Sequence, residues 1–152
     1  MQDYLVWFFT LLVIPVIIAK ADILRRALDL KQLQKIKAIY SWWNKENMPR
    51  KLRGASLFLN ECDISTQTPI PLHGRVDQVF KTKSNTLIPV DTKTRKSFSI
   101  YKSDIIQLSV YQVILKQKYG VKYKVSNVGY VRVVVQSGVN EIIRYIPVKL
   151  IT

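Results

Sequence analysis

Residues 72–93 read LHGRVDQVFKTKSNTLIPVDTK and predict the β-hairpin around which the rest of the fold is organised. Apolar and polar residues alternate in its two halves, 72–80 and 86–93, as they do in strands with one buried face. The polar residues between the halves predict a turn of odd length centred on Ser84. Residues at equal distances from Ser84 along the chain are therefore expected to face each other across the hairpin.

This register brings two carboxylates together on one face of the hairpin. Asp77 and Asp91 lie at equal distances from Ser84, and directly paired residues have Cβ atoms about 5 Å apart. Lys93 lies two residues beyond Asp91, so the strand period of two directs its side chain to the same face, at about 7 Å. The hairpin therefore predicts a cluster of two acids and one base.

A divalent cation is the simplest way to offset the repulsion between two carboxylates at this distance. Their hard oxygen atoms suit Mg²⁺ or Mn²⁺, which can hold a phosphate and lower the pKa of a bound water. The ammonium group of Lys93 can orient that water or neutralise the phosphate. Arg75 and Arg95, expected on the same face, suit flanking phosphates. The cluster thus predicts phosphodiester hydrolysis.

The same residues can instead form the solvated, salt-bridged face of an ordinary surface hairpin. The apolar residues of both strands argue against this reading, because they mark the strands as central: Val76, Val79, Ile88 and Val90. Gly74 is a second argument, since glycine in a strand permits the close approach of another backbone or of a ligand.

The rest of the sequence predicts an α/β domain with a single core. Residues 56–61 have the alternation of a further strand. Residues 103–119 are apolar around most of a helical circumference and predict a helix that packs on the sheet and ends at Gly120. Residues 125–135 predict a strand buried on both faces, and residues 141–147 a return strand after a turn. The expected fold is a mixed central sheet flanked by helices.

The N-terminus predicts a transmembrane anchor, residues 1–20, followed by an amphipathic basic helix and linker, residues 21–54, and the domain, residues 55–152. Residues 4–19 carry no charge and can cross a bilayer that thins locally. The basic residues after this run place the domain on the cytoplasmic side: Lys20, Arg25 and Arg26. A cleaved signal peptide and a buried core helix are the alternatives. The expectation is a single-pass membrane protein with a cytoplasmic C-terminal domain.

Charge narrows the class of partner. The chain has 24 Lys and Arg against 10 Asp and Glu. A polyanion, either nucleic acid or an anionic membrane leaflet, is therefore expected to bind, because neutralised phosphates release condensed counterions. Residues 23–43 combine apolar residues at helical spacing with basic ones, and such a helix can lie on headgroups, touch nucleic acid or remain solvated. The single Cys62 excludes an internal disulfide framework and a site built from several cysteines.

Three motifs resemble the RecB-like branch of the PD-(D/E)XK nuclease superfamily. Residues 74–77 (GRVD) match G-x-x-D, residues 91–93 (DTK) match (D/E)-x-K and residues 107–111 (QLSVY) match Q-x-x-x-Y, in the order found in that branch. The resemblance covers residues 57–132. CRISPR-associated RecB-like exonucleases are similar in these motifs, but this chain lacks the four cysteines that hold an iron–sulfur cluster in several relatives.

The resemblance implies a restriction-endonuclease-like fold, DNA as the expected substrate and a role for each motif residue. The implied catalytic and metal-binding residues are Asp77, Asp91 and Lys93, with the backbone carbonyl of Thr92 as a further metal ligand. Gln107 and Tyr111 share one helix face, which in relatives positions nucleic acid or the lysine. Asp104 matches an acidic position common just before that glutamine.

One departure leaves rival functions open. Many relatives have a metal-binding His upstream of the first aspartate, whereas His73 lies four residues from Asp77, about 13 Å along a strand and too far for a ligand. Glu46 or Glu61 can supply the missing ligand or remain surface carboxylates. The first rival is a catalytically degenerate module that binds nucleic acid without cutting it. The second is a structural protein that coats an anionic membrane.

Overall fold

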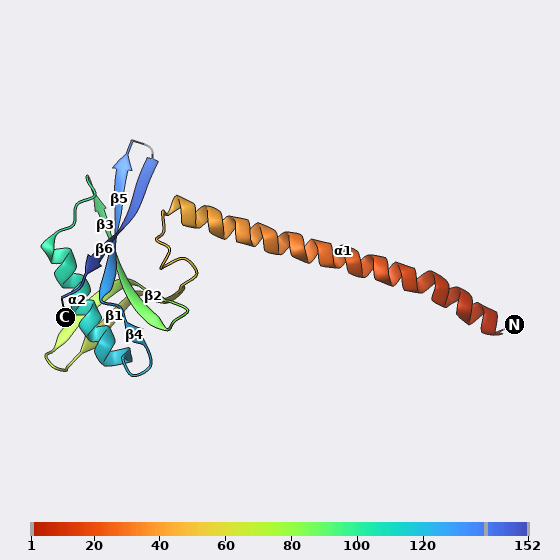
Figure 1. The fold of residues 1–152 in the computed structure, drawn as a ribbon, viewed down its shortest axis with the longest axis horizontal. Coiled ribbons are helices and arrows are strands. Elements are labelled where there is room, and N and C mark those ends of the chain that lie inside the picture. Colours follow the sequence, from red (N-terminus) through yellow and green to blue (C-terminus); the bar gives the residue numbers. More distant parts are fainter. Residues whose placement is uncertain (1, 139, 152) are drawn as a thin grey trace. The chain divides into compact units, whose positions relative to one another are not determined.

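The computed structural model describes the backbone of residues 2–138 and 140–151 and, within them, the side chains of all but residues 2–19, 22 and 23. Figure 1 shows the helices and strands of this part of the chain. In order they are α1 (Gln2–Lys45), β1 (Ser56–Thr66), β2 (Leu72–Lys81), β3 (Thr86–Arg95), α2 (Lys102–Tyr119), β4 (Lys124–Val125), β5 (Val128–Ser137) and β6 (Asn140–Lys149). The order of elements expected from the sequence is confirmed, and β4 is an additional short strand.

The strands form one mixed sheet with β3 at its centre. Their order is β1-β2-β3-β5-β6, with β4 also paired to β3. β1, β2 and β3 pair antiparallel, β3 pairs parallel with β5, and β5 pairs antiparallel with β6. A parallel pair needs a crossover connection, and α2 provides it by packing on one face of the sheet (Figure 1). The expected mixed sheet is therefore confirmed.

Apolar clusters on the two faces of the sheet fix the position of α2. Alternate residues of β3 point to opposite faces, so Leu87 joins the cluster under α2, whereas Ile88 and Val90 join the second cluster. The fully buried residues that α2 adds to the first cluster are Leu108, Ile114 and Leu115. Burying each of these side chains contributes roughly 1.5–3 kcal/mol. This packing holds the helix rigidly over β3.

The chain divides into two compact units, residues 1–42 and 43–152. The segment between α1 and β1 packs within the second unit, because Met48 and Leu52 are only 2% and 1% exposed and belong to the second apolar cluster. The folded domain therefore begins earlier than residue 55, the boundary expected from the sequence.

The expected transmembrane anchor, residues 1–20, falls in α1. Met1 and the side chains of residues 2–19 lie outside the described residues. In the part of the chain that the structure describes, no helix is sufficiently long and apolar to cross a membrane.

Candidate active site

β2 and β3 pair in the register expected from the sequence and then separate at the two aspartates. The pairs are Lys81 with Leu87, Phe80 with Ile88, Val79 with Pro89, and Gln78 with Val90. Every pair lies symmetrically about Ser84, which confirms the turn centre. The ladder ends one step before Asp77 and Asp91, so the direct pairing expected for them is not found. Instead, the Asp77 carboxylate accepts a hydrogen bond from the Thr92 N–H at 2.7 Å.

An irregularity in β2 explains this separation. Val76 and Val79 both lie in the cluster under α2, although residues three apart in a regular strand point to opposite faces. The strand therefore twists at Asp77 and Gln78. The adjacent strand is irregular at the same level, because Glu61 has a φ of 44°, a rare value for a residue other than glycine. Asp77 thus leaves the ladder with its carboxylate only partly buried.

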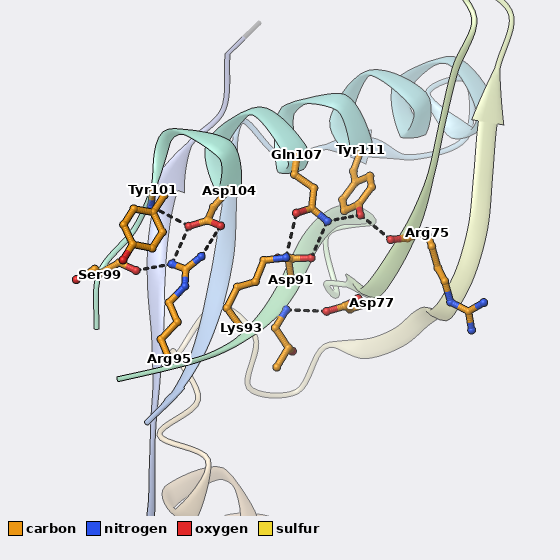
Figure 2. Close-up of polar contacts among 11 residues, drawn as sticks. Arg75, Asp77, Asp91, Lys93, Arg95, Ser99, Tyr101, Asp104, Gln107 and Tyr111 are labelled. Carbon is orange, nitrogen blue, oxygen red and sulfur yellow. Dashed lines mark hydrogen bonds and ion pairs between the residues drawn. The ribbon is translucent and has the colours of Figure 1, made fainter. Parts of the chain in front are cut away.

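Asp91 and Lys93 of β3 form an ion pair under α2 (Figure 2). Lys93 Nζ lies 2.9 Å from Asp91 Oδ2, and the two side chains are 30% and 1% exposed, respectively. Burial raises the pKa of Asp91, and Lys93 opposes this effect. Burial disfavours the charged form of Lys93, but the hydrogen bond and charge of Asp91 outweigh it and raise the pKa of Lys93. At neutral pH Lys93 is therefore an ammonium ion.

Gln107 of α2 bonds to both members of this ion pair. Its side-chain amide nitrogen donates to Asp91 Oδ1 at 3.1 Å and to the Tyr111 hydroxyl at 2.6 Å, and its oxygen accepts from Lys93 Nζ at 3.1 Å (Figure 2). The helix position therefore sets where both charged groups lie. The expected common face of Gln107 and Tyr111 is confirmed.

Tyr111 extends the network to β2. Its hydroxyl donates to the backbone carbonyl of Arg75 at 2.5 Å. A Cβ at Gly74 would lie 2.8 Å from Tyr111 Cε1, closer than real Cβ atoms come to a neighbour. Burial raises the pKa of Tyr111, so the phenol stays protonated and can donate at neutral pH. The close approach expected at Gly74 is thus made by an aromatic ring.

Arg75, expected near a phosphate, is exposed at the surface. Its guanidinium lies 3.6 Å from the Glu61 carboxylate and 4.0 Å from that of Asp63, and its side chain is 61% exposed. Figure 2 shows the guanidinium pointing away from Lys93. Exposed pairs of this kind contribute little to stability, so the group is free to exchange its partners for a phosphate.

Arg95, expected in the same role, is engaged in a structural contact. Its two terminal nitrogens bind the two oxygens of Asp104 at 2.8 and 2.7 Å. Asp104 also accepts the Tyr101 N–H at 2.8 Å, which closes the first turn of α2. The hydrogen bond from Arg95 is the main reason that the pKa of Asp104 is lowered. The sequence singled out both Arg95 and Asp104 but not their pairing, because nothing in the motif spacing links position 95 to position 104.

Three oxygen donors are available for a cation at the strand separation. They are the Asp77 carboxylate, the Thr92 carbonyl and Asp91 Oδ2, which a cation would share with the Lys93 ammonium 2.9 Å away. N–H and C=O of one strand residue point to the same side, so this carbonyl faces Asp77 as the Thr92 N–H does. Hard oxygens of this kind fit Mg²⁺ or Mn²⁺, and Mg²⁺ usually keeps several waters. Within the described residues, no group of three His, Cys, Asp or Glu side chains could hold a metal ion.

The residues considered for a further ligand differ in their surroundings. Glu46 accepts hydrogen bonds from Arg132 at 2.9 and 2.7 Å and is thus committed to a structural pair. Glu61 lines a surface groove of about 350 Å³ together with Asp77 and Thr92. His73 lines a separate depression. Of the three residues, Glu61 is the best placed to bind a cation beside Asp77. The sequence does not predict this placement, because it depends on a left-handed backbone conformation that glutamate rarely adopts.

Comparison with known proteins agrees with this geometry. Residues 15–145 match the family model of the PD-(D/E)XK nuclease superfamily. The match covers most of the chain and includes both strands of the hairpin and α2. A search of curated proteins gives no significant match. Because the match spans the elements that bring Asp77, Asp91 and Lys93 together, we conclude that the chain belongs to the PD-(D/E)XK nuclease superfamily.

Proposed function

We propose that this nuclease-superfamily member is a metal-dependent enzyme of the RecB-like branch that hydrolyses phosphodiester bonds in DNA. The observation that carries the proposal is the network in which one amide, that of Gln107, holds both Asp91 and Lys93. Removing a carboxylate from water is costly unless it is paired. Asp91 is nevertheless 1% exposed and lies beside the half-buried ammonium of Lys93. In an ordinary surface hairpin both charged groups would remain in water, so their burial argues for a functional site.

Each residue would have a distinct role in the reaction. Asp77, Asp91 and the Thr92 carbonyl would hold Mg²⁺ or Mn²⁺, which when bound supplies Lewis-acid stabilisation of the phosphate and a more acidic water. The Lys93 ammonium, hydrogen-bonded to Gln107 at 3.1 Å, would attract the scissile phosphate and orient the water. Arg75, which lines the same groove as Asp77, would contact the next phosphate.

Cleavage assays with the full chain test this proposal. Linear duplex, circular duplex and single-stranded DNA, with single-stranded RNA beside them, are incubated with Mg²⁺, Mn²⁺ or EDTA. We expect metal-dependent cleavage of DNA that is lost in Lys93→Ala and kept in Lys149→Ala, because Lys149 is exposed on β6 and has no part in the site. Cleavage of RNA alone would contradict the substrate, and cleavage in EDTA would contradict the metal.

The second candidate is a degenerate module that binds nucleic acid without cutting it. The absence of a third clustered His, Cys, Asp or Glu among the described residues favours it. In the same assays this function predicts DNA binding in every condition and cleavage in none.

Membrane attachment and the cytoplasmic position of the domain are a separate part of the proposal. They rest on the uncharged residues 4–19 and on the basic residues that follow this run, Lys20, Arg25 and Arg26. We expect the full chain to remain with membranes after an alkaline carbonate wash, and a chain without residues 1–20 to be released. Release of the full chain would contradict attachment. Protection of the domain from protease in sealed vesicles whose cytoplasmic face is outward would contradict its orientation.

A further inference from the structure

A second surface groove lies at the turn of the β2–β3 hairpin and contains none of the motif residues. Its volume is about 540 Å³. Three segments distant in sequence line it: Lys51 and Arg53 before β1, Lys83 and Ser84 in the turn, and Ser126 after β4. All of them belong to the unit formed by residues 43–152. The groove is therefore a feature of the folded domain itself.

The charged residues that line this groove are all basic: Lys51, Arg53 and Lys83. Segments 50–56, 81–86 and 118–126 contain eight Lys and Arg and no Asp or Glu. They meet in space, because the Lys124 N–H donates to the Asn85 carbonyl at 3.1 Å, and Lys83 Cε lies 3.9 Å from the Cβ position of Gly54. Among the described residues, no carboxylate forms an ion pair with these eight cations. A positive field without compensating acids attracts a polyanion.

Neutral donors in the groove complement this charge. The hydroxyls of Thr82 and Ser84 lie 2.9 Å apart, and those of Ser84 and Thr86 lie 3.3 Å apart. These two contacts use two of the three hydroxyl hydrogens and leave one to donate outward. Arg53 donates its Nε to the Met48 carbonyl at 2.8 Å, which fixes the guanidinium and leaves its terminal nitrogens for a ligand. Cations combined with hydroxyl donors are the usual contacts of proteins with phosphate and sugar groups.

The groove opens on the same face of β3 as the groove beside Asp77, whereas Asp91 and Lys93 have the opposite parity and lie under α2 on the other face. Thr86 and Ile88 line the groove, and Thr92 lines the separate groove beside Asp77. These three β3 residues have the same parity and so share one face of the strand. The distance from Thr86 to Thr92 along the strand is about 20 Å, roughly the length of six base pairs of duplex DNA.

We propose that this basic groove is a second nucleic-acid-binding site, which holds the phosphate backbone of the DNA about six base pairs along β3 from the groove beside Asp77. It binds without reading bases, adds affinity and fixes the register of the duplex on the enzyme. The identity of the DNA as a substrate rests on the proposed function. The inference that the groove binds the DNA phosphate backbone rests only on the charges and hydrogen-bond donors of the groove.

Binding measurements with the full chain test the proposal. Fluorescence anisotropy of a labelled duplex in EDTA reports binding without cleavage. The groove variant is Lys51→Glu/Lys83→Glu, and the control Lys102→Glu/Lys149→Glu makes the same charge change at exposed residues outside the groove. We expect the groove variant to weaken binding at least about tenfold and to reduce the slope of log K against log salt by about 2. The control should bind within a factor of about two of the unmutated chain.

Other outcomes would overturn the proposal. If both double variants weaken DNA binding equally, the effect is one of net charge alone. If the unmutated chain does not bind DNA, or if the groove variant binds as tightly as the unmutated chain, the groove is not a binding site. Vesicles containing phosphatidylserine form a second arm, and loss of vesicle binding with unchanged DNA binding would assign the groove to a membrane. If Lys51→Glu/Lys83→Glu does not fold by circular dichroism, Lys51→Ala/Lys83→Ala replaces it, with Lys102→Ala/Lys149→Ala as its control.

The binding and cleavage assays test the groove and the proposed nuclease function separately. Groove-dependent binding without metal-dependent cleavage would support the groove and contradict the nuclease. Metal-dependent cleavage by the unmutated chain, with equal DNA binding by the groove and control variants, would support the nuclease and contradict the groove.

Discussion

One side-chain amide, that of Gln107, hydrogen-bonds to both a carboxylate and an ammonium group in the candidate site. Its nitrogen binds Asp91 and its oxygen binds Lys93, each at 3.1 Å. The long lysine side chain is thereby held in one of its many rotamers before substrate arrives. We therefore expect Gln107 to act as a positioning residue through the groups that it holds.

Replacing Gln107 tests this role. Gln107→Ala should lower the specificity constant for cleavage by roughly 10- to 100-fold, the usual effect of losing a residue that orients the groups at a metal site. Gln117→Ala, at an exposed position of the same helix, is the matched control and should cleave normally. Steady-state kinetics on one DNA substrate measure both variants. A Gln107→Ala rate within about twofold of the unmutated enzyme would refute the positioning role.

The buried pair of Asp104 and Arg95 makes stability depend on pH. The pKa of Asp104 is lowered from 3.8, so its ionised form stabilises the fold above pH 3.8, and this contribution is lost as pH falls through the lower folded-state value. Asp104→Asn should cost about 3 kcal/mol of unfolding free energy at pH 7 and progressively less below pH 3.8. Urea unfolding across this range measures the difference. Glu141→Gln, on exposed β6, is the control, and a pH-independent loss in Asp104→Asn would contradict the assignment.

Sequence patterns predicted which segments of the domain form strands and helices, but not the irregularity at the end of the β2–β3 pairing. Alternation identified β2 and β3, and the polar residues 81–85 gave a register that the observed pairing from Lys81 to Gln78 confirms. The twist at Asp77 was not predictable, because it depends on packing of both Val76 and Val79 under α2. Such a break in alternation arises from tertiary contacts that a strand pattern does not contain.

Contact between α2 and β2 explains the glycine of the first motif. Gly74→Ala should destabilise the domain by about 1–3 kcal/mol, because the new methyl group would lie 2.8 Å from the Tyr111 ring. A double-mutant cycle with Tyr111→Ala, measured by urea unfolding, isolates this clash. The double variant should be more stable than the sum of the single effects predicts. If the effects of Gly74→Ala and Tyr111→Ala on the free energy of unfolding are strictly additive, the Tyr111 ring is not the reason for glycine at position 74.

At the scale of the whole molecule, the domain includes a segment that reads as a linker. Pro49 and Gly54 interrupt the helical pattern, and this suggested a domain start at residue 55. The structure instead buries Met48 and Leu52 in the second cluster. Isolated apolar residues in a short irregular segment have no periodicity, so their burial could not be read from the sequence.

Two truncated chains test this boundary. Residues 43–152 should unfold cooperatively and keep the activity of the domain, since they form one compact unit. Residues 55–152 should be largely unfolded, because each lost core side chain costs roughly 2–5 kcal/mol and a whole domain has only about 5–15 kcal/mol of stability. Urea unfolding followed by circular dichroism measures both. Equal stability of the two truncated chains would contradict the role of the segment.

The most direct test of the central claim is the rate of DNA cleavage by Asp91→Asn in the presence of Mg²⁺. The substitution keeps the size of the buried side chain and removes the charge that would bind the cation, and Glu141→Gln makes the same chemical change at an exposed position. We predict that Asp91→Asn loses about a thousandfold or more in rate, the equivalent of several kcal/mol of transition-state stabilisation, while Glu141→Gln cleaves normally. Folded Asp91→Asn that cleaves as fast as the unmutated enzyme would contradict the claim.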